Sequence, residues 1–148
     1  MRWNLLYEVL EINRGCKARA TAQWPQNAAR PELLFLEMMA QTAGLIFGSL
    51  DDFQTDIVFA KVDHAHFHPV LPGTSLLVIQ ASAEEIRPEG GWFQIQILQN
   101  ETLVAEARLL LANAGRLDPV SQTSVTFHRH FMTHYQIRGK VSPAGILS

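Results

Sequence analysis

The stretch that decides the fold is residues 31–48, which read PELLFLEMMAQTAGLIFG. Pro31 suits the first helical position because it needs no amide hydrogen, and Glu32 sits where the helix dipole favours a negative charge. The residues that follow are apolar on nearly every side, with Glu37 and Gln41 as exceptions. A helix of this kind is buried around most of its circumference. We therefore predict one long buried helix here.

Short segments bounded by turn residues flank this helix on both sides and are typical of strands. We expect strands over residues 3–12, 16–24, 57–67, 75–87, 92–98 and 103–112. A helix that is apolar nearly all round must be wrapped by the sheet to bury its surface. The prediction is an α+β fold, in which a curved antiparallel sheet of about six strands wraps around one long central helix.

The chain length of 148 residues fits one domain. We assign residues 1–113 to the wrapped-helix domain. Residues 114–148 differ in character, with Asp118-Pro119, a Ser/Thr run and only a weak strand or helix pattern from Val125 to Ile137. We expect this segment to be a C-terminal appendage, and its role is left open.

Composition narrows the class of protein. The net charge of −2 argues against a nucleic-acid binder that relies on phosphate attraction. The single Cys16 excludes an internal disulfide framework and a Cys-based zinc site, and favours a reducing compartment. Glu8 comes too early in the chain for the apolar region of a signal peptide. Glu37 interrupts the longest apolar stretch, whose length is no more than the about 18 uninterrupted apolar residues that a membrane span needs. We expect a soluble, cytoplasmic protein without a membrane span.

Two segments carry a resemblance to a known family. Residues 31–44, PELLFLEMMAQTAG, resemble the central-helix motif of the β-hydroxyacyl-[acyl-carrier-protein] dehydratases of the hotdog fold, in which a catalytic Glu precedes an Ala-Met-Ala-Gln-like run. Residues 62–73, VDHAHFHPVLPG, are similar to that family's Asp…Phe…Pro-Val-x-Pro-Gly segment. The resemblance runs from residue 3 to about 113. It implies a hotdog fold and a dehydratase-like lyase of fatty-acid or polyketide-type metabolism, acting on thioesters of acyl-carrier protein or coenzyme A without a cofactor.

The resemblance also implies candidate catalytic residues. Dehydration of a 3-hydroxyacyl thioester needs a base for the α-proton and an acid for the departing hydroxyl. Glu37 matches the family's helix acid, whereas the family's His position falls on Gln23, and no histidine precedes His64. An amide does not titrate near pH 7, so Gln23 is expected to orient the substrate hydroxyl. We expect Glu37 to be buried, with a raised pKa or a partner, and a purely structural contact is the alternative.

Three further residues complete the implied site. Backbone amides near Glu32 and Leu33, at the helix start, would polarise the thioester carbonyl. Glu32 stands where the family has a glycine. Gln41 lies one helical turn beyond Glu37 and is assigned to substrate binding.

Two other functions remain open. A hotdog thioesterase using the helix Glu with a water would not need the missing His. A non-catalytic module that binds acyl thioesters or a carrier protein would need neither the helix Glu nor the His.

No metal site is expected. His64, His66 and His68 alternate along a predicted strand, where neighbouring same-face residues stand about 6.6 Å apart, too far for one ion to bind all three easily. The other three histidines of the chain, His128, His130 and His134, lie in the tail and are likewise not expected to hold a metal.

Charged residues make up 18% of the chain, against a usual value of about 25%. This shortfall suggests apolar surface buried against a partner. Hotdog protomers typically join their sheets edge to edge and complete their sites between subunits. We therefore predict a homodimer, or a higher assembly of such dimers.

Overall fold

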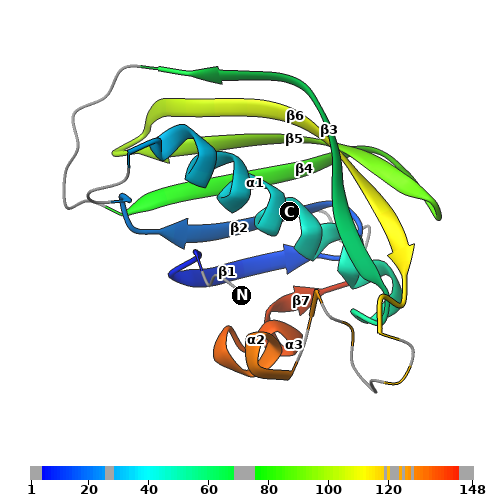
Figure 1. Ribbon diagram of the computed structural model, residues 1–148. Helices are drawn as coiled ribbons and strands as arrows, with labels where there is room; N and C mark the ends of the chain where they lie inside the picture. Colours follow the sequence, from blue (N-terminus) through cyan, green and yellow to red (C-terminus); the bar gives the residue numbers. More distant parts are fainter. Residues whose placement is uncertain are drawn as a thin grey trace.

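The computed structural model describes residues 5–25, 29–68, 76–118, 120, 124, 126–127 and 129–143, and has the α+β architecture shown in Figure 1. Its elements are β1 (Glu8–Asn13), β2 (Lys17–Ala22), α1 (Pro31–Gly48), the 3₁₀ turn η1 (Ser49–Asp51), β3 (Asp56–Phe67), β4 (Leu77–Arg87), β5 (Gly90–Gln99), β6 (Thr102–Gly115), α2 (Arg129–His134), α3 (Ile137–Lys140) and β7 (Val141–Ser142).

The strands form one sheet in the order β3-β6-β5-β4-β2-β1-β7. All neighbours are antiparallel except β1 and β7, which pair in parallel through Ile12 and Val141. The sheet curves around α1, which contacts each of the strands β1 to β6 (Figure 1). The predicted curved sheet around one central helix is confirmed, and the tail adds a seventh strand to the six expected.

The core lies between α1 and the concave face of the sheet. Alternating residues of the central strands point inward, as Phe93, Ile95 and Ile97 do on β5, and all three are fully buried. Met39 of α1 is likewise completely buried. Each side chain of this kind gains about 1.5–3 kcal/mol on burial, so the sheet and helix hold one another in place.

Burial along α1 is uneven. From Thr42 onward every residue of the helix is buried, as predicted. In the first half, by contrast, Leu33 is 58% exposed and Glu37 is exposed. The prediction that Glu37 is buried is therefore wrong for the single protomer, because the sheet covers only one side of the helix's N-terminal half. By length and composition alone, the stretch Pro31–Asp51 would suffice to cross a membrane, but 61% of its apolar 18-residue window is buried inside the protein.

The tail packs against the hotdog-like core. Phe131, Tyr135 and Ile137 are buried, and the Tyr135 hydroxyl donates a hydrogen bond to the Leu6 carbonyl at 2.5 Å. In the part of the tail that follows β6, the backbone amides of Leu117 and Thr126 donate hydrogen bonds to the buried Asp56 carboxylate. These contacts tie the described part of the tail to both β1 and the start of β3.

Several predicted bounds shift. β1 begins at Glu8, β4 begins at Leu77, and β6 continues to Gly115 through its pairing with Asp56. The predicted Pro-Val-x-Pro-Gly turn, residues 69–73, lies outside the described residues.

Candidate functional site

The candidate site is built on the N-terminal half of α1. Leu33, Glu37 and Gln41 are spaced four residues apart, so they form one stripe along the helix. Leu33 and Glu37 are exposed, whereas Gln41 is half-buried. A carboxylate thus stands on the exposed side of the central helix, next to an exposed apolar side chain. This stripe is the part of the helix that the chain's own sheet leaves uncovered.

Gln23 lies on the other side of the same helix. It is exposed and directly follows β2, and its neighbour Trp24 packs edge-on against Phe35, with ring centroids 5.5 Å apart. Phe35 in turn stacks on Phe67, at the end of β3, at 6.4 Å. Glu37 is two residues from Phe35, which is about 200° around the helix axis. Within one protomer the structure therefore does not bring Gln23 and Glu37 together.

The start of the helix supplies few amides. Pro31 carries no N–H, and the Leu33 amide donates to the Arg30 carbonyl at 3.2 Å. A thioester carbonyl at Leu33 would have to compete with that bond. Glu32, whose side chain is exposed, is the remaining residue of the expected pair.

An open strand edge borders this region. β3 pairs with β6 along one edge, and within the described residues no strand pairs with its other edge. Val58, Phe59, Val62 and Phe67 of this strand are each 36–40% exposed. A long, unpaired edge with exposed apolar side chains is typical of a surface that pairs with another chain.

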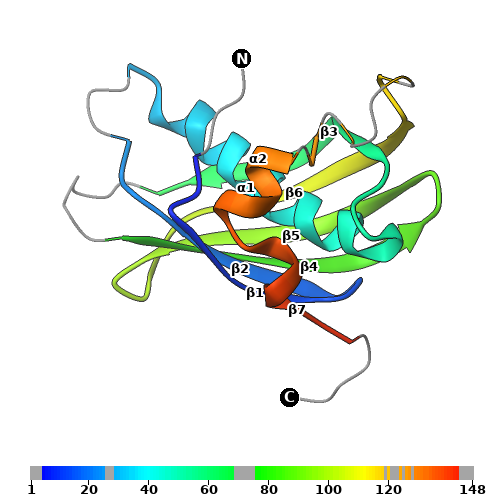
Figure 2. The ribbon, with the colours of Figure 1, turned by 90° about the horizontal axis from the view of Figure 1, so that it is seen from below.

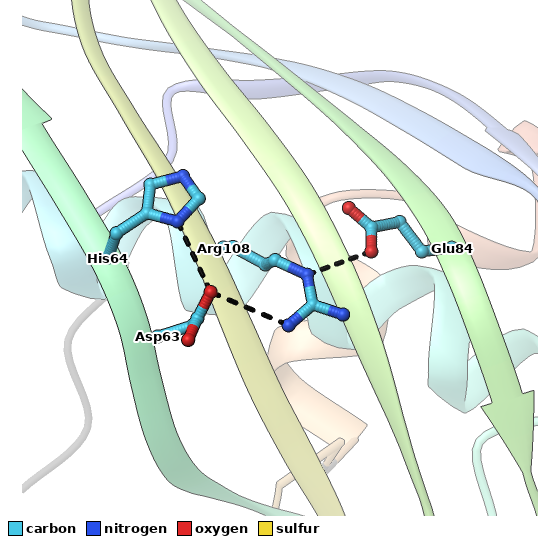
Figure 3. A network of polar contacts seen from close by, with 4 residues as sticks. All are labelled: Asp63, His64, Glu84 and Arg108. Atoms are coloured by element: carbon cyan, nitrogen blue, oxygen red, sulfur yellow. Dashed lines mark hydrogen bonds and ion pairs between the residues drawn. The ribbon is translucent and has the colours of Figure 1, made fainter.

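A second polar cluster lies on the convex face of the sheet, away from α1 (Figure 3). The Arg108 guanidinium donates to the Glu84 carboxylate at 2.8 Å and lies 3.6 Å from that of Asp63, which contacts His64 at 3.4 Å. Arg108 also stacks over the Trp92 ring at 4.1 Å. The hydrogen bond from Arg108 holds the pKa of Glu84 below its usual value. This cluster links β3, β6, β5 and β4 and was not predicted from the sequence.

His64 and His66 of β3 lie next to one another, and His68 lies beyond the end of the strand. A bulge between Val62 and His64 turns Asp63 toward Arg108, and the rings of His64 and His66 lie 5.6 Å apart. In the described part of the chain, no three His, Cys, Asp or Glu side chains are grouped so as to hold a metal ion. His64 and its neighbours lie across the sheet from the Glu37 stripe.

No family model matches the chain. Among curated proteins it is similar to the 3-hydroxyacyl-[acyl-carrier-protein] dehydratase FabZ of Polaromonas naphthalenivorans (strain CJ2), with 31% identity over 72% of this chain and 83% of the relative. The FabZ protein of Variovorax paradoxus (strain S110) is 32% identical, over 73% and 82%.

Solved structures share the fold at low identity. The dehydratase heterocomplex ApeI:P from Xenorhabdus doucetiae matches with a TM-score of 0.62 at 16% identity, over 75% of this chain and 83% of that one. The protein smu.793 from Streptococcus mutans, bound to acetyl CoA, matches with 0.64 at 12%, over 78% and 94%. The thioesterase HI1161 from Haemophilus influenzae matches with 0.59 at 13%, over 72% and 77%. These likenesses confirm the predicted hotdog fold.

Proposed function

Because the chain belongs to the family of 3-hydroxyacyl-[acyl-carrier-protein] dehydratases, we propose that it interconverts 3-hydroxyacyl and 2-enoyl thioesters. The observation that carries this proposal is the exposed carboxylate of Glu37 on the uncovered stripe of the central helix. A general acid–base group must reach the proton that it moves, and Glu37 is the titratable side chain in the middle of that stripe.

The proposed elimination needs one titratable group. The Glu37 carboxylate takes the proton from the α-carbon, the new carbon–carbon double bond forms, and the carbon–oxygen bond to the 3-hydroxyl breaks. The carboxylic acid formed on Glu37 gives its proton to the departing hydroxyl, which leaves as water. Gln23 orients that hydroxyl by hydrogen bonding, and the Glu32 amide polarises the thioester carbonyl. Gln41 binds the substrate beside Glu37.

The site is completed in a homodimer. Gln23 and Glu37 diverge around the helix in one protomer, so their joint action requires Glu37 of one subunit and Gln23 of the other. The open edge of β3 and its exposed apolar side chains support pairing of two β3 strands. Such pairing would also bury part of the apolar surface suggested by the low share of charged residues. The single exposed Cys16 fits a cytoplasmic location.

Thioester hydrolysis is the second candidate. A carboxylate and a water molecule suffice for it, so the amide at Gln23 is no obstacle. The same Glu37 would act as the base that activates water, and the products would be a free acid and a thiol. A third candidate, non-catalytic binding of acyl thioesters, needs no proton transfer at Glu37.

One experiment separates the three candidates. The purified protein is mixed with crotonyl and 3-hydroxybutyryl thioesters of carrier protein and coenzyme A, and with longer-chain analogues, while enoyl absorbance and free thiol are followed. We expect hydration and dehydration that fall at least a hundredfold in Glu37→Gln and persist in the control Glu89→Gln, an exposed Glu on the β4–β5 turn. Thiol release that depends on Glu37 would replace the proposal with a thioesterase. Saturable binding without turnover would replace it with a binding module.

A further inference from the structure

Three aromatic rings meet at the N-terminal half of α1. Phe35 of the helix lies edge-on to Trp24, which follows β2, with ring centroids 5.5 Å apart. The Phe35 ring also stacks on that of Phe67, the last residue of β3, at 6.4 Å. The row Trp24–Phe35–Phe67, which we call the aromatic bridge, thus links the chain just after β2 to the end of β3.

The aromatic bridge spans the concave side of the sheet. Because β4, β5 and β6 lie between β2 and β3 in the sheet, these two strands can be linked in this way only across the space that α1 occupies. The ends of β2 and β3 lie on either side of the start of α1 (Figure 1), and Figure 2 shows the same end of the molecule from below. The bridge therefore lies across the opening between the helix and the sheet at this end.

Phe35 fills this opening. It is only 4% exposed, and Met39, one helical turn further along α1, is completely buried. Because protein interiors are packed as densely as organic crystals, the space behind Phe35 holds side chains instead of a slot for a hydrocarbon chain. Trp24 is half-buried and Phe67 is 39% exposed, so these two rings offer apolar surface on the outer side of the bridge.

The groups proposed to hold the reacting carbons lie next to the bridge. Gln23, which we assign to the 3-hydroxyl, directly precedes Trp24. Glu32, whose amide we assign to the thioester carbonyl, lies three residues before Phe35 and therefore on the same side of α1. A substrate held by both groups would direct the carbons beyond its 3-position toward Trp24 and Phe35.

We propose that the aromatic bridge limits the length of the acyl chain, so that the site takes short-chain thioesters such as crotonyl and excludes long-chain ones. The inference rests on the proposed function, because it names the substrate class of that site. The first carbon beyond the 3-position gains apolar contact with the exposed parts of Trp24 and Phe67. A longer chain must displace the buried Phe35 ring or turn back into water, and in neither case does it gain from its length.

The test compares two chain lengths in variants of Phe35. The reactive probes are crotonyl-CoA and 2-octenoyl-CoA, and in the wild type we expect kcat/KM to be at least about tenfold higher for crotonyl-CoA. Phe35→Ala should raise kcat/KM for 2-octenoyl-CoA and lower the crotonyl-to-octenoyl ratio about tenfold. Phe35→Leu should lower the ratio by less, and because it leaves a smaller cavity it keeps the test valid if Phe35→Ala does not fold.

The matched control is Phe47→Leu, the same substitution at another buried phenylalanine of α1, which packs on Phe93 at 6.2 Å near the C-terminal end of the helix. This control should keep the wild-type ratio. A substitution that only loosens the helix lowers kcat/KM for both thioesters, whereas an opened slot raises the value for the longer one.

Binding is measured apart from turnover. In the Glu37→Gln background, the Kd values of butyryl-CoA and octanoyl-CoA should show the same preference for the short chain, and the same loss of preference when Phe35 is replaced. That preference without turnover in the wild type would fault the proposed reaction and leave the chain-length limit standing. Equal or better use of 2-octenoyl-CoA by the wild type would overturn the limit, as would equal ratios in Phe35→Leu and Phe47→Leu. Failure of both thioesters to bind would overturn the limit together with the proposed function.

Discussion

Two glycines of α1 offer a test of how the tail packs on the central helix. A Cβ at Gly48 would lie 2.6 Å from Cζ of Phe127 and 2.7 Å from Cδ1 of Phe53, closer than carbon atoms approach in proteins. A Cβ at Gly44, one turn earlier, would meet no atom within 4 Å in the described structure. The two sites therefore share a helix and differ in the space available.

The magnitudes follow from this difference. Replacing a helical glycine by alanine gains up to about 1 kcal/mol of helix propensity, so we expect Gly44→Ala to raise the free energy of unfolding by about that amount. Gly48→Ala has the same type of gain but also overpacks the contact with Phe127 and Phe53, at a cost of about 1–3 kcal/mol. The two variants should thus differ by about 1–3 kcal/mol, with Gly48→Ala the less stable.

Urea unfolding followed by circular dichroism measures both variants against the wild type. The double variant Gly48→Ala/Phe127→Leu should recover part of the loss, because it removes the ring atoms nearest to the new methyl group. Equal stability of Gly44→Ala and Gly48→Ala would refute the packing of Phe127 on α1.

Four further predictions concern other parts of the structure. Asp56→Ala leaves the Leu117 and Thr126 amides without their acceptor, and should lower the free energy of unfolding by about 2–3 kcal/mol in urea. The hydrogen bond from Arg108 holds the folded pKa of Glu84 below its usual value. The stability from this bond is therefore complete above the usual pKa and is lost as pH falls through the folded pKa. The difference in free energy of unfolding between the wild type and Arg108→Gln should narrow on acidification, and a constant difference would contradict this. Burial raises the pKa of Tyr135 to about 12 from 10.0. Its contribution to the free energy of unfolding is therefore complete below pH 10 and declines as pH rises toward 12. The loss of stability in Tyr135→Phe, measured by urea unfolding, should shrink over that range. Finally, Val62→Lys on the open edge of β3 should shift sedimentation from dimer to monomer, and an unchanged dimer would place the interface elsewhere.

The sequence predicted the elements that have strong local signals. Pro31 and the long apolar run predicted α1, and the strand expected over residues 92–98 lies within β5. The same run could not indicate that Glu37 is exposed, because an apolar sequence does not tell how far the sheet extends along the helix. That property belongs to the tertiary arrangement.

The two short tail helices and the Arg108 cluster could not be predicted from the sequence for similar reasons. α2 and α3 have six and four residues, too few for a clear periodic pattern, and their stability comes from burial of Phe131 and Ile137. The pairing of Arg108 with Glu84 and Asp63 depends on strand register and on bulges in β3 and β4. The residues of the candidate site, in contrast, were located by the family resemblance, and Gln23, Glu32, Leu33, Glu37 and Gln41 still stand as predictions.

The short strand β7 has a consequence for how many copies can join. A sheet with two free edges can add a new chain at each end, and repeated addition gives a filament rather than a closed particle. Here β7 and the tail occupy the β1 edge, where Arg14 also donates its amide to the Ser142 carbonyl. In the described part of the sheet β3 is the long outer strand, so if the proposed dimer forms through β3, edge-to-edge growth there would stop after two copies. The pairing of Val141 and Ser142 with β1 would thus favour a closed dimer over a growing filament.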